Sequence, residues 1–282
     1  MKTVTLKQIA KKLLFITLLV AMQGVNAQDL KIISFNIRYW NNIDGENGWP
    51  NRRDAVARMI REERPAAIGL QEALIGQLQY LDSCLPEYRR IGVGRDDGKE
   101  AGEFMAIYYD TTQLRLDFSQ TLWLSETPDV PSIGWDAACR RTATVAYFCD
   151  KKTHVNFYYI NTHLDHVGKT ARAESVKLIS SLFTPSQSAL INPAIVGGDM
   201  NTTILDTVLL PFEYVRLTSA CDQVSTKLCH TDTYNAFGKG PGSPIDHFFV
   251  RNIEVKEFRI LNGDYGVPYI SDHYPIEMVI EL

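Results

Sequence analysis

The fold is decided by the stretch Ile195-Val196-Gly197-Gly198-Asp199-Met200-Asn201, because an apolar run passes through two glycines and ends in polar residues. Short apolar runs are typical of buried strands, whereas carboxylates and carboxamides are poor strand residues. Polar side chains that directly follow a strand lie at the edge of a sheet, where α/β and sandwich folds form their clefts. A turn or a helix cap is the alternative explanation for Asp199 and Asn201 taken alone.

Five other polar clusters follow apolar runs in the same way. They are Asn36 after residues 32–35, Glu72 after residues 68–71, His163 in Asn161-Thr162-His163-Leu164-Asp165-His166, Asp246 after Pro244-Ile245, and Asp272-His273 in Ser271-Asp272-His273-Tyr274-Pro275. Each cluster is weak evidence alone, since an isolated Asn36 is more often part of an Asx turn. His163 competes with its neighbours Asp165 and His166, but it directly ends its strand. All six clusters together predict one functional cleft.

Periodicity predicts the remaining elements. Strands are expected at residues 30–37, 67–71, 104–109, 114–124, 142–149, 155–162, 194–198, 245–250, 255–261 and 274–280, and helices at 53–63, 74–85 and 170–183. Residues 40–52 read as a long, turn-rich loop. Strands between early helices and a helix after residue 168 predict two packed sheets flanked by helices. Without repeats, low-complexity tracts or a linker, residues 28–282 are expected to form one domain.

Residues 1–27 are typical of a secretory signal peptide. Four lysines precede the apolar run at residues 13–22, and Val25-Asn26-Ala27 places small residues where a signal peptidase cleaves. The run is shorter than the ~20 residues that span a bilayer, which disfavours an anchor. We therefore expect a mature chain that begins near Gln28, is secreted or periplasmic, has no transmembrane segment and is a monomer.

Removal of residues 1–27 makes the chain more acidic. Of 29 Lys and Arg, four lie in residues 1–27, so 25 remain against 33 Asp and Glu, for a net charge of −8. Proteins that bind long polyanions usually present a basic face. The charge favours small or singly charged substrates over duplex nucleic acid, but it leaves open a nuclease with a local basic patch.

Five cysteines, at positions 84, 139, 149, 221 and 229, leave at least one thiol free. Export permits disulfides, and the two candidate pairs are Cys221 with Cys229 and Cys139 with Cys149. The alternative is buried free thiols with at most one bridge.

The six clusters share an oxygen-rich composition that selects hard cations such as Mg²⁺ or Mn²⁺, whereas a zinc site would contain more His or Cys. Such cations suit phosphoryl chemistry. A carboxylate with a neighbouring Asn can position and deprotonate a water molecule. A carboxylate paired to a histidine keeps the imidazole protonated, ready for a phosphate or a departing oxygen.

In this order, the motifs resemble those of the endonuclease/exonuclease/phosphatase superfamily, which has the fold of deoxyribonuclease I and exonuclease III. The matching runs are Phe35-Asn36, Gln71-Glu72, Asn161-Thr162-His163, Gly198-Asp199-Met200-Asn201, Ile245-Asp246-His247 and Ser271-Asp272-His273-Tyr274-Pro275. The resemblance covers nearly the whole mature chain. It implies an α/β (α+β) four-layer sandwich, with two packed mixed β-sheets flanked by helices, and Mg²⁺-dependent (or Mn²⁺-dependent) cleavage of phosphoester bonds.

The resemblance also implies roles for the metal and water ligands. Glu72 resembles the main metal ligand, with Asn36 and Asp272 beside it. Asp199 resembles the residue that orients or deprotonates the attacking water, and Asn201 the residue that holds the water or the phosphate.

A second set of residues resembles the groups around the phosphate. Asp246 resembles the acid that orients His273, whose imidazole acts on the scissile phosphate. His163 resembles a second histidine that acts as general acid or transition-state stabiliser. Arg141 resembles a strand-start arginine that approaches the substrate phosphate, and its neighbour Arg140 is an alternative. Asn235 stands where relatives often carry a polar residue that faces the site.

These residues predict a secreted phosphoesterase that acts on a nucleotide, a nucleic-acid end, a sugar phosphate or a lipid head group. The alternatives are an extracellular nuclease on DNA or RNA and a sphingomyelinase-like phospholipid phosphodiesterase. A non-catalytic binding scaffold is the least favoured class, because no matched position has lost its chemistry. The residue types set the bond class and the metal, but they do not set the leaving group.

Overall fold

The computed structural model describes residues 29–183 and 192–282, so the predicted signal peptide lies outside the described residues. In this part of the chain, strands form two six-stranded mixed sheets. The first has the order β11-β12-β1-β2-β4-β3 and contains β1 (Asp29–Asn36), β2 (Ala67–Ala73), β3 (Tyr88–Ile91), β4 (Phe104–Asp110), β11 (Glu254–Ile260) and β12 (Ile276–Glu281). The second has the order β5-β6-β7-β8-β10-β9 and contains β5 (Leu114–Trp123), β6 (Thr142–Asp150), β7 (Asn156–His163), β8 (Ala194–Asp199), β9 (Thr218–Ser219) and β10 (Asp246–Arg251).

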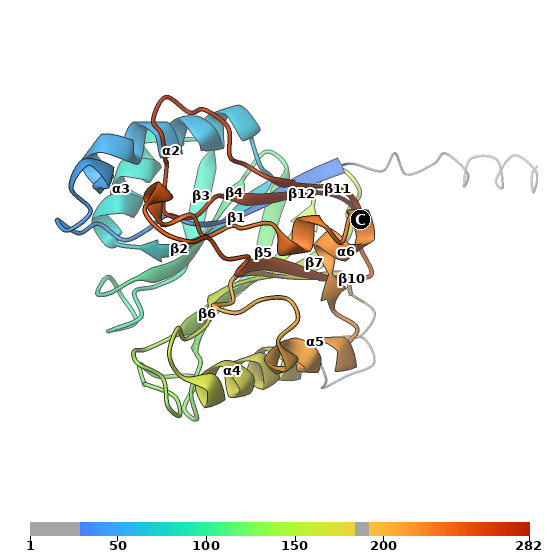
Figure 1. The fold of residues 1–282 in the computed structure, drawn as a ribbon. Helices are drawn as coiled ribbons and strands as arrows, with labels where there is room; N and C mark the ends of the chain where they lie inside the picture. The colour runs from blue at the N-terminus through green and yellow to red at the C-terminus, as the bar shows by residue number, and fades with distance from the viewer. Residues whose placement is uncertain (1–28, 184–191) are drawn as a thin grey trace, which may run out of the picture.

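Helices cover the outer face of each sheet. In Figure 1, α2 (Trp49–Glu63) and α3 (Ile75–Cys84) lie on one side of the molecule, and α4 (Lys169–Ser181) and α5 (Leu210–Tyr214) on the other. A short helix, α6 (Ala220–Val224), packs near β10 and β11. The predicted four-layer sandwich of two packed mixed sheets flanked by helices is therefore confirmed.

Apolar side chains fill all three spaces between these layers. Successive strand residues point to opposite faces, so Ile32 lies between the sheets while Ile33 packs under α2 and α3. In the second sheet, Phe248 lies between the sheets and Phe249 packs toward α4 and α5. Strands buried on both faces read as continuous apolar runs, which is the pattern that the sequence shows.

One predicted helix start was wrong, and one edge strand was missed. The first predicted helix starts at Trp49 instead of Arg53, because Pro50 occupies the first helical turn, where its missing N–H has no intrahelical partner to lose. The expected loop at residues 40–52 is shorter accordingly. Edge strand β3 was missed because its four residues, Tyr88–Ile91, include two arginines and have no clear alternation.

The cysteines divide into one bridge and three free thiols. Cys221 and Cys229 form a disulfide, with Cα atoms 5.5 Å apart, while Cys84, Cys139 and Cys149 are free. The alternative pair Cys139–Cys149 is wrong. Most of the chain between these two residues runs along the extended strand β6, which places them at its opposite ends.

None of the helices in residues 29–183 and 192–282 combines the length and the apolar character that a membrane span needs.

A polar contact joins the two sheets close to their shared edge. The register between β2 and β4 shifts between Leu70 and Ala73. Just before this shift, Asn161 of β7 donates from Nδ2 to the carbonyls of Leu70 and Ala106, at 2.9 Å each, and accepts from Gln71 Nε2. Gly69 leaves the space for this contact, because a Cβ there would lie 2.7 Å from the Asn161 side chain.

Replacing Asn161 should destabilise the fold. We expect Asn161→Ala to lower the free energy of unfolding by about 2–5 kcal/mol, since two buried carbonyls and the Gln71 amide lose a partner. Equilibrium unfolding in guanidinium chloride measures the change. The control is Asn156→Ala on the same strand, where the side chain makes no hydrogen bond to a described residue, and we expect a change within about 0.5 kcal/mol. Equal stability of the two variants would contradict the role of this contact.

Candidate active site

Seven of the ten predicted site residues line one cleft. A cavity of about 580 Å³ is lined by residues from both sheets, among them Glu72, Arg141, His163, Asp199, Asn201, Asp272 and His273. β1, β7 and β8 end at this edge, and the antiparallel β10 begins there. A larger cavity of about 830 Å³, between residues 204–230 and Phe249, is lined by none of the predicted site residues. Convergent titratable groups identify a site better than size does, so the smaller cavity is the candidate.

His273 lies between two buried carboxylates. Its Nδ1 is 2.8 Å from Asp246 Oδ2, and its Nε2 is 3.7 Å from Asp199 Oδ2. The two aspartates are brought together because they are directly opposed in the antiparallel pair of β8 and β10. Burial opposes a charge on His273, but Asp246 and Asp199 outweigh it and raise the pKa of the ring to about 10. The imidazole is therefore a cation at neutral pH.

Asp199 is the centre of the cluster. Its Oδ2 accepts from Asn36 Nδ2 at 3.1 Å and lies 3.3 Å from His163 Nε2, while its Oδ1 accepts from the backbone of Asn201. Burial, together with the neighbouring Asp246 carboxylate, raises the pKa of Asp199 to about 7. This carboxylate can therefore exchange a proton near neutral pH.

His163 and Asn201 form the next layer of the same cluster. The Asn201 amide donates to the Leu164 carbonyl and lies 2.9 Å from His163 Nε2. Burial, with the nearby cations of Arg141 and His273, lowers the pKa of His163 well below its usual value. The ring is therefore uncharged at neutral pH, unlike that of His273.

Glu72 and Asp272 flank a cation of the protein itself. The Arg38 guanidinium lies 4.0 Å from Glu72 Oε2 and 3.8 Å from Asp272 Oδ2. Asn36 links the two halves of the cluster, because its Nδ2 donates to Glu72 Oε1 at 3.0 Å as well as to Asp199. Its oxygen accepts from the Arg38 backbone, so the amide turns its donor side toward the carboxylates.

A buried arginine holds the loops that carry these groups. Arg52 donates to the carbonyls of Ile37, Arg38 and Ile270, and Ser271 donates from Oγ to the Asn36 carbonyl. The segments that follow β1 and precede Asp272 are thereby tied together although they are far apart in sequence. Sequence reasoning missed Arg52 because it stood outside the predicted helix.

Arg141 lies at the cleft and is itself oriented. Its Nε donates to Asp165 Oδ2 at 3.3 Å, and its Nη2 lies 2.8 Å from His166 Nδ1. Backbone N–H groups of Gly168, Val167 and Ala138 outweigh burial and lower the pKa of Asp165 to about 2, so the carboxylate stays charged. The alternative Arg140 instead pairs with the half-exposed Asp96.

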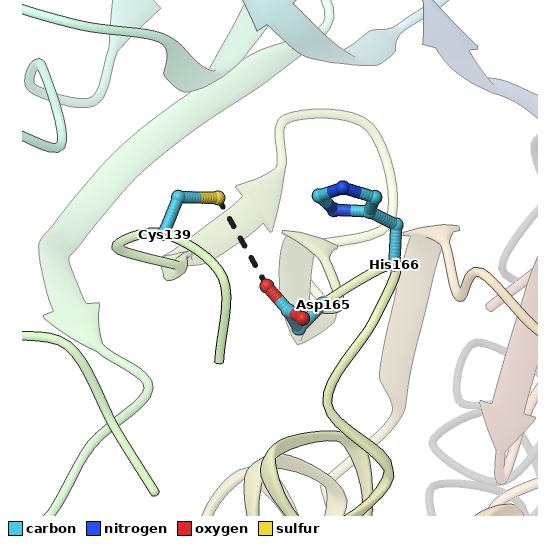
Figure 2. Close-up of side chains that lie close together, drawn as sticks. All are labelled: Cys139, Asp165 and His166. Atoms are coloured by element: carbon cyan, nitrogen blue, oxygen red, sulfur yellow. Dashed lines mark hydrogen bonds between the residues drawn. The ribbon is translucent and has the colours of Figure 1, made fainter. Parts of the chain in front are cut away.

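Figure 2 shows that Asp165 and His166 lie beside the free thiol of Cys139. These three side chains have the spacing of metal ligands. The Arg141 guanidinium is already bonded to both Asp165 and His166, however, and a positive charge there disfavours a bound cation. The cluster is better described as the support of Arg141.

A second ion pair lines the cleft on the segment between β3 and β4. Arg95 Nη1 donates to Glu103 Oε2 at 2.7 Å. Burial and the nearby Glu72 carboxylate raise the pKa of Glu103 to about 7, against the opposing effect of Arg95. Neither residue was singled out from the sequence, because no apolar strand run leads directly into either of them.

Asn235 is not brought to the cleft wall. Its amide nitrogen donates to the Ser271 carbonyl, and its oxygen accepts from the Phe237 backbone. Its backbone N–H donates to the Asp272 carbonyl. The residue therefore orients the segment that carries Asp272 and His273, and both polar ends of its side chain are already bonded within the protein.

The donor set fits a hard divalent cation. Glu72 and Asp272 line the cleft and offer carboxylate oxygens, the ligands that Mg²⁺ and Mn²⁺ prefer. The buried group of Asp199, Asp246 and His273 also has the spacing of a metal site. In that group, His273 is protonated against Asp246, which leaves its Nδ1 unavailable to a metal.

Residues 42–273 match the family described as the Endonuclease/Exonuclease/phosphatase family. The chain belongs to this family. Members of the family are phosphoester hydrolases, and the buried acidic and histidine cluster of this chain accords with that chemistry.

Several relatives share the whole fold. A Bacteroides vulgatus endonuclease/exonuclease/phosphatase is 36% identical, with a TM-score of 0.84 over 90% of this chain and 99% of its own. A Bacteroides thetaiotaomicron mannosyl-6-phosphatase is 33% identical, with a TM-score of 0.80 over 89% of this chain and 99% of its own. Protein L388 of Acanthamoeba polyphaga mimivirus is 27% identical over an alignment 274 residues long, which covers 89% of this chain and 100% of that protein. The predicted membership of the superfamily is confirmed.

Proposed function

We propose that this chain is a secreted, Mg²⁺- or Mn²⁺-dependent hydrolase of phosphate monoesters that uses an activated water molecule. The observation that carries the proposal is the set Asp246–His273–Asp199. The His273 ring is hydrogen-bonded to Asp246 and lies 3.7 Å from Asp199, so a cation lies beside a carboxylate whose pKa is raised to about 7. Phosphoester hydrolysis needs both groups around one phosphorus atom, since a proton must leave the water while negative charge is stabilised.

Each residue has a role that follows from its contacts. Asp199 would accept the proton of the attacking water, and Asn201 would hold that water or the phosphate. The His273 imidazolium would stabilise negative charge on the phosphate, while Asp246 fixes the orientation of the ring. His163 is uncharged, so it would act as a hydrogen-bonding group on the transition state.

Two further groups complete the phosphate site. The Arg141 guanidinium, oriented by Asp165, would bind a phosphate oxygen. Glu72 and Asp272 would hold the divalent cation, with Asn36 beside them. The bound cation would neutralise charge on the transferring phosphoryl group.

The monoester is favoured over a diester by two observations. The relative named mannosyl-6-phosphatase is 33% identical over nearly its whole length. The net charge of −8 expected for the mature chain also disfavours a long polyanion. Hydrolysis of DNA, RNA or sphingomyelin at rates above those of all monoesters would favour the nuclease or phospholipid phosphodiesterase alternative.

The metal requirement can be measured directly. EDTA should abolish turnover of 4-nitrophenyl phosphate, and Mg²⁺ or Mn²⁺ should restore it. Glu72→Gln should lower turnover and also raise the Mg²⁺ concentration needed for half-maximal activity, because one charged ligand is lost. Glu174→Gln on α4, outside the cleft, is the control and should leave both values unchanged. Full activity in EDTA would refute the metal requirement.

The acid–base groups should behave as a unit. Asp199→Asn and His273→Gln should each lower turnover by at least ~10²-fold, the range of positioned acid–base groups. The double variant should be little worse than the poorer single variant, because the residues act on the same step. Single variants with turnover near that of the wild type would mean that the cleft does not catalyse this reaction.

Export is supported by the lysine-rich start of the sequence and by the Cys221–Cys229 disulfide. The mature protein should begin near Gln28 and be recovered outside the cytoplasm. Intact-mass measurement of the native protein tests this, and a mass that includes residues 1–27 would contradict it.

A further inference from the structure

We propose that Arg95 and Glu103 bind the hydroxyl groups of a sugar leaving group, so that the substrate of this cleft is a sugar phosphate. The inference rests on the proposed function and adds the substrate class.

The pair is held in the cleft wall. Arg95 and Glu103 line the same cavity as Glu72 and Arg141, and each of the two side chains is only 14% exposed. The 2.7 Å ion pair is reinforced by a hydrogen bond from the Arg95 backbone to the Glu103 carbonyl. Trp123 adds a bond from its indole to the Arg95 carbonyl. The side chains are therefore fixed before any ligand arrives, which lowers the entropic cost of binding.

Each partner has a polar atom that makes no hydrogen bond within the described part of the protein and is not fully buried, and Arg95 Nε is a further, buried atom without a partner there. Within the described residues, Arg95 Nη2 and Glu103 Oε1 make no hydrogen bond, and neither is among the buried atoms without a partner. The pair therefore offers a donor and an acceptor from two side chains that are bonded to each other in the cleft wall. Two neighbouring hydroxyls of a sugar match this arrangement, because each hydroxyl both donates and accepts.

The polar atoms and the charge of the pair disfavour other leaving groups. A phenyl or alkyl group would cover the two polar atoms without bonding them, which costs free energy. A leaving group with further phosphates would be repelled by the Glu103 carboxylate and by the nearby Glu72 carboxylate. A neutral group with several hydroxyls satisfies the donor and the acceptor and avoids this repulsion.

The position of the pair relative to the phosphate site fits this role. Glu72, the proposed metal ligand, and Arg141, the proposed phosphate ligand, line the same cavity and are among the residues whose charges act on Glu103. A sugar attached to a phosphate at Arg141 would thus lie within the same cavity as the pair.

The test compares two substrates that share the phosphate and differ in the leaving group. We expect Glu103→Gln to lower kcat/KM for mannose 6-phosphate by at least ~10-fold, because a charged acceptor is lost. The same variant should change kcat/KM for 4-nitrophenyl phosphate by less than ~2-fold, because that substrate has no hydroxyls to bind.

Arg95→Lys keeps the charge but loses the second guanidinium nitrogen, and it should show the same selective loss. Asp96→Asn, which removes an outer ion pair of the same segment, is the matched control and should affect neither substrate.

Equal losses on both substrates, or no loss on either, would overturn the inference. Thermal melting shows whether each variant is folded, and Arg95→Lys replaces Glu103→Gln if the latter is not. Binding of mannose 6-phosphate to Asp199→Asn, measured by calorimetry with and without Glu103→Gln, separates the two proposals. Glu103-dependent binding without turnover by the wild type would support the sugar site and refute the phosphatase activity, whereas no binding would refute the sugar site.

Discussion

The contact of Tyr159 and Asn161 with the opposite sheet is the constraint on which the rest of the structure depends. Tyr159 donates to the Ile33 carbonyl, and Asn161 donates to Leu70 and Ala106. Apolar packing between two sheets is non-directional and permits sliding, but a buried amide is stable only where its partners lie. These bonds fix how β7 sits over β1 and β2. They therefore bring the ends of strands from both sheets to one edge.

The same edge carries backbone strain. Glu72 lies within the register shift of β2, between Leu70 and Ala73, and has a φ of 61°. Arg38 and Asn201 also have positive φ values, of 56° and 49°. Each such residue costs of order 1–3 kcal/mol, and such strain persists only where surrounding contacts determine the conformation. Here those contacts are the bonds of Asn161, Arg52 and the Asp199 carboxylate. Stabilising contacts elsewhere in the fold thus offset the backbone strain that directs side chains into the cleft.

Buried charge gives the cleft its chemical asymmetry. Two histidines lie beside the same Asp199 carboxylate, yet the pKa of His273 rises and that of His163 falls. The difference is that His273 has Asp246 as a second partner, whereas His163 faces Arg141. Two histidine side chains therefore differ in charge because their neighbours differ. Burial strengthens the electrostatic effect of each neighbour on the ring. One imidazole is set as a cation and the other as a neutral hydrogen-bonding group.

The sequence by itself determined the layers and most of the polar set. Apolar runs and helical spacing predicted most of the strands and the three longer helices, and polar residues at strand ends, such as Asp199 and His163, were visible because they interrupt those runs. Short edge strand β3 and the start of α2 were missed, since a four-residue strand with two arginines and a helix start at a proline give too little periodicity to read.

Only the tertiary structure decided which of these residues act together. Asn235 stands near Asp246 in sequence, but its bonds go to Ser271 and Phe237, whereas Arg95 and Glu103 line the cleft without any local signal. Arg38 and Arg52 likewise gain their partners from segments that the fold brings close. The local sequence pattern predicts whether a side chain is buried and at which end of a strand it lies. It cannot report the partners, because hydrogen bonds and charge interactions depend on distances between segments that only the packing of the two sheets sets.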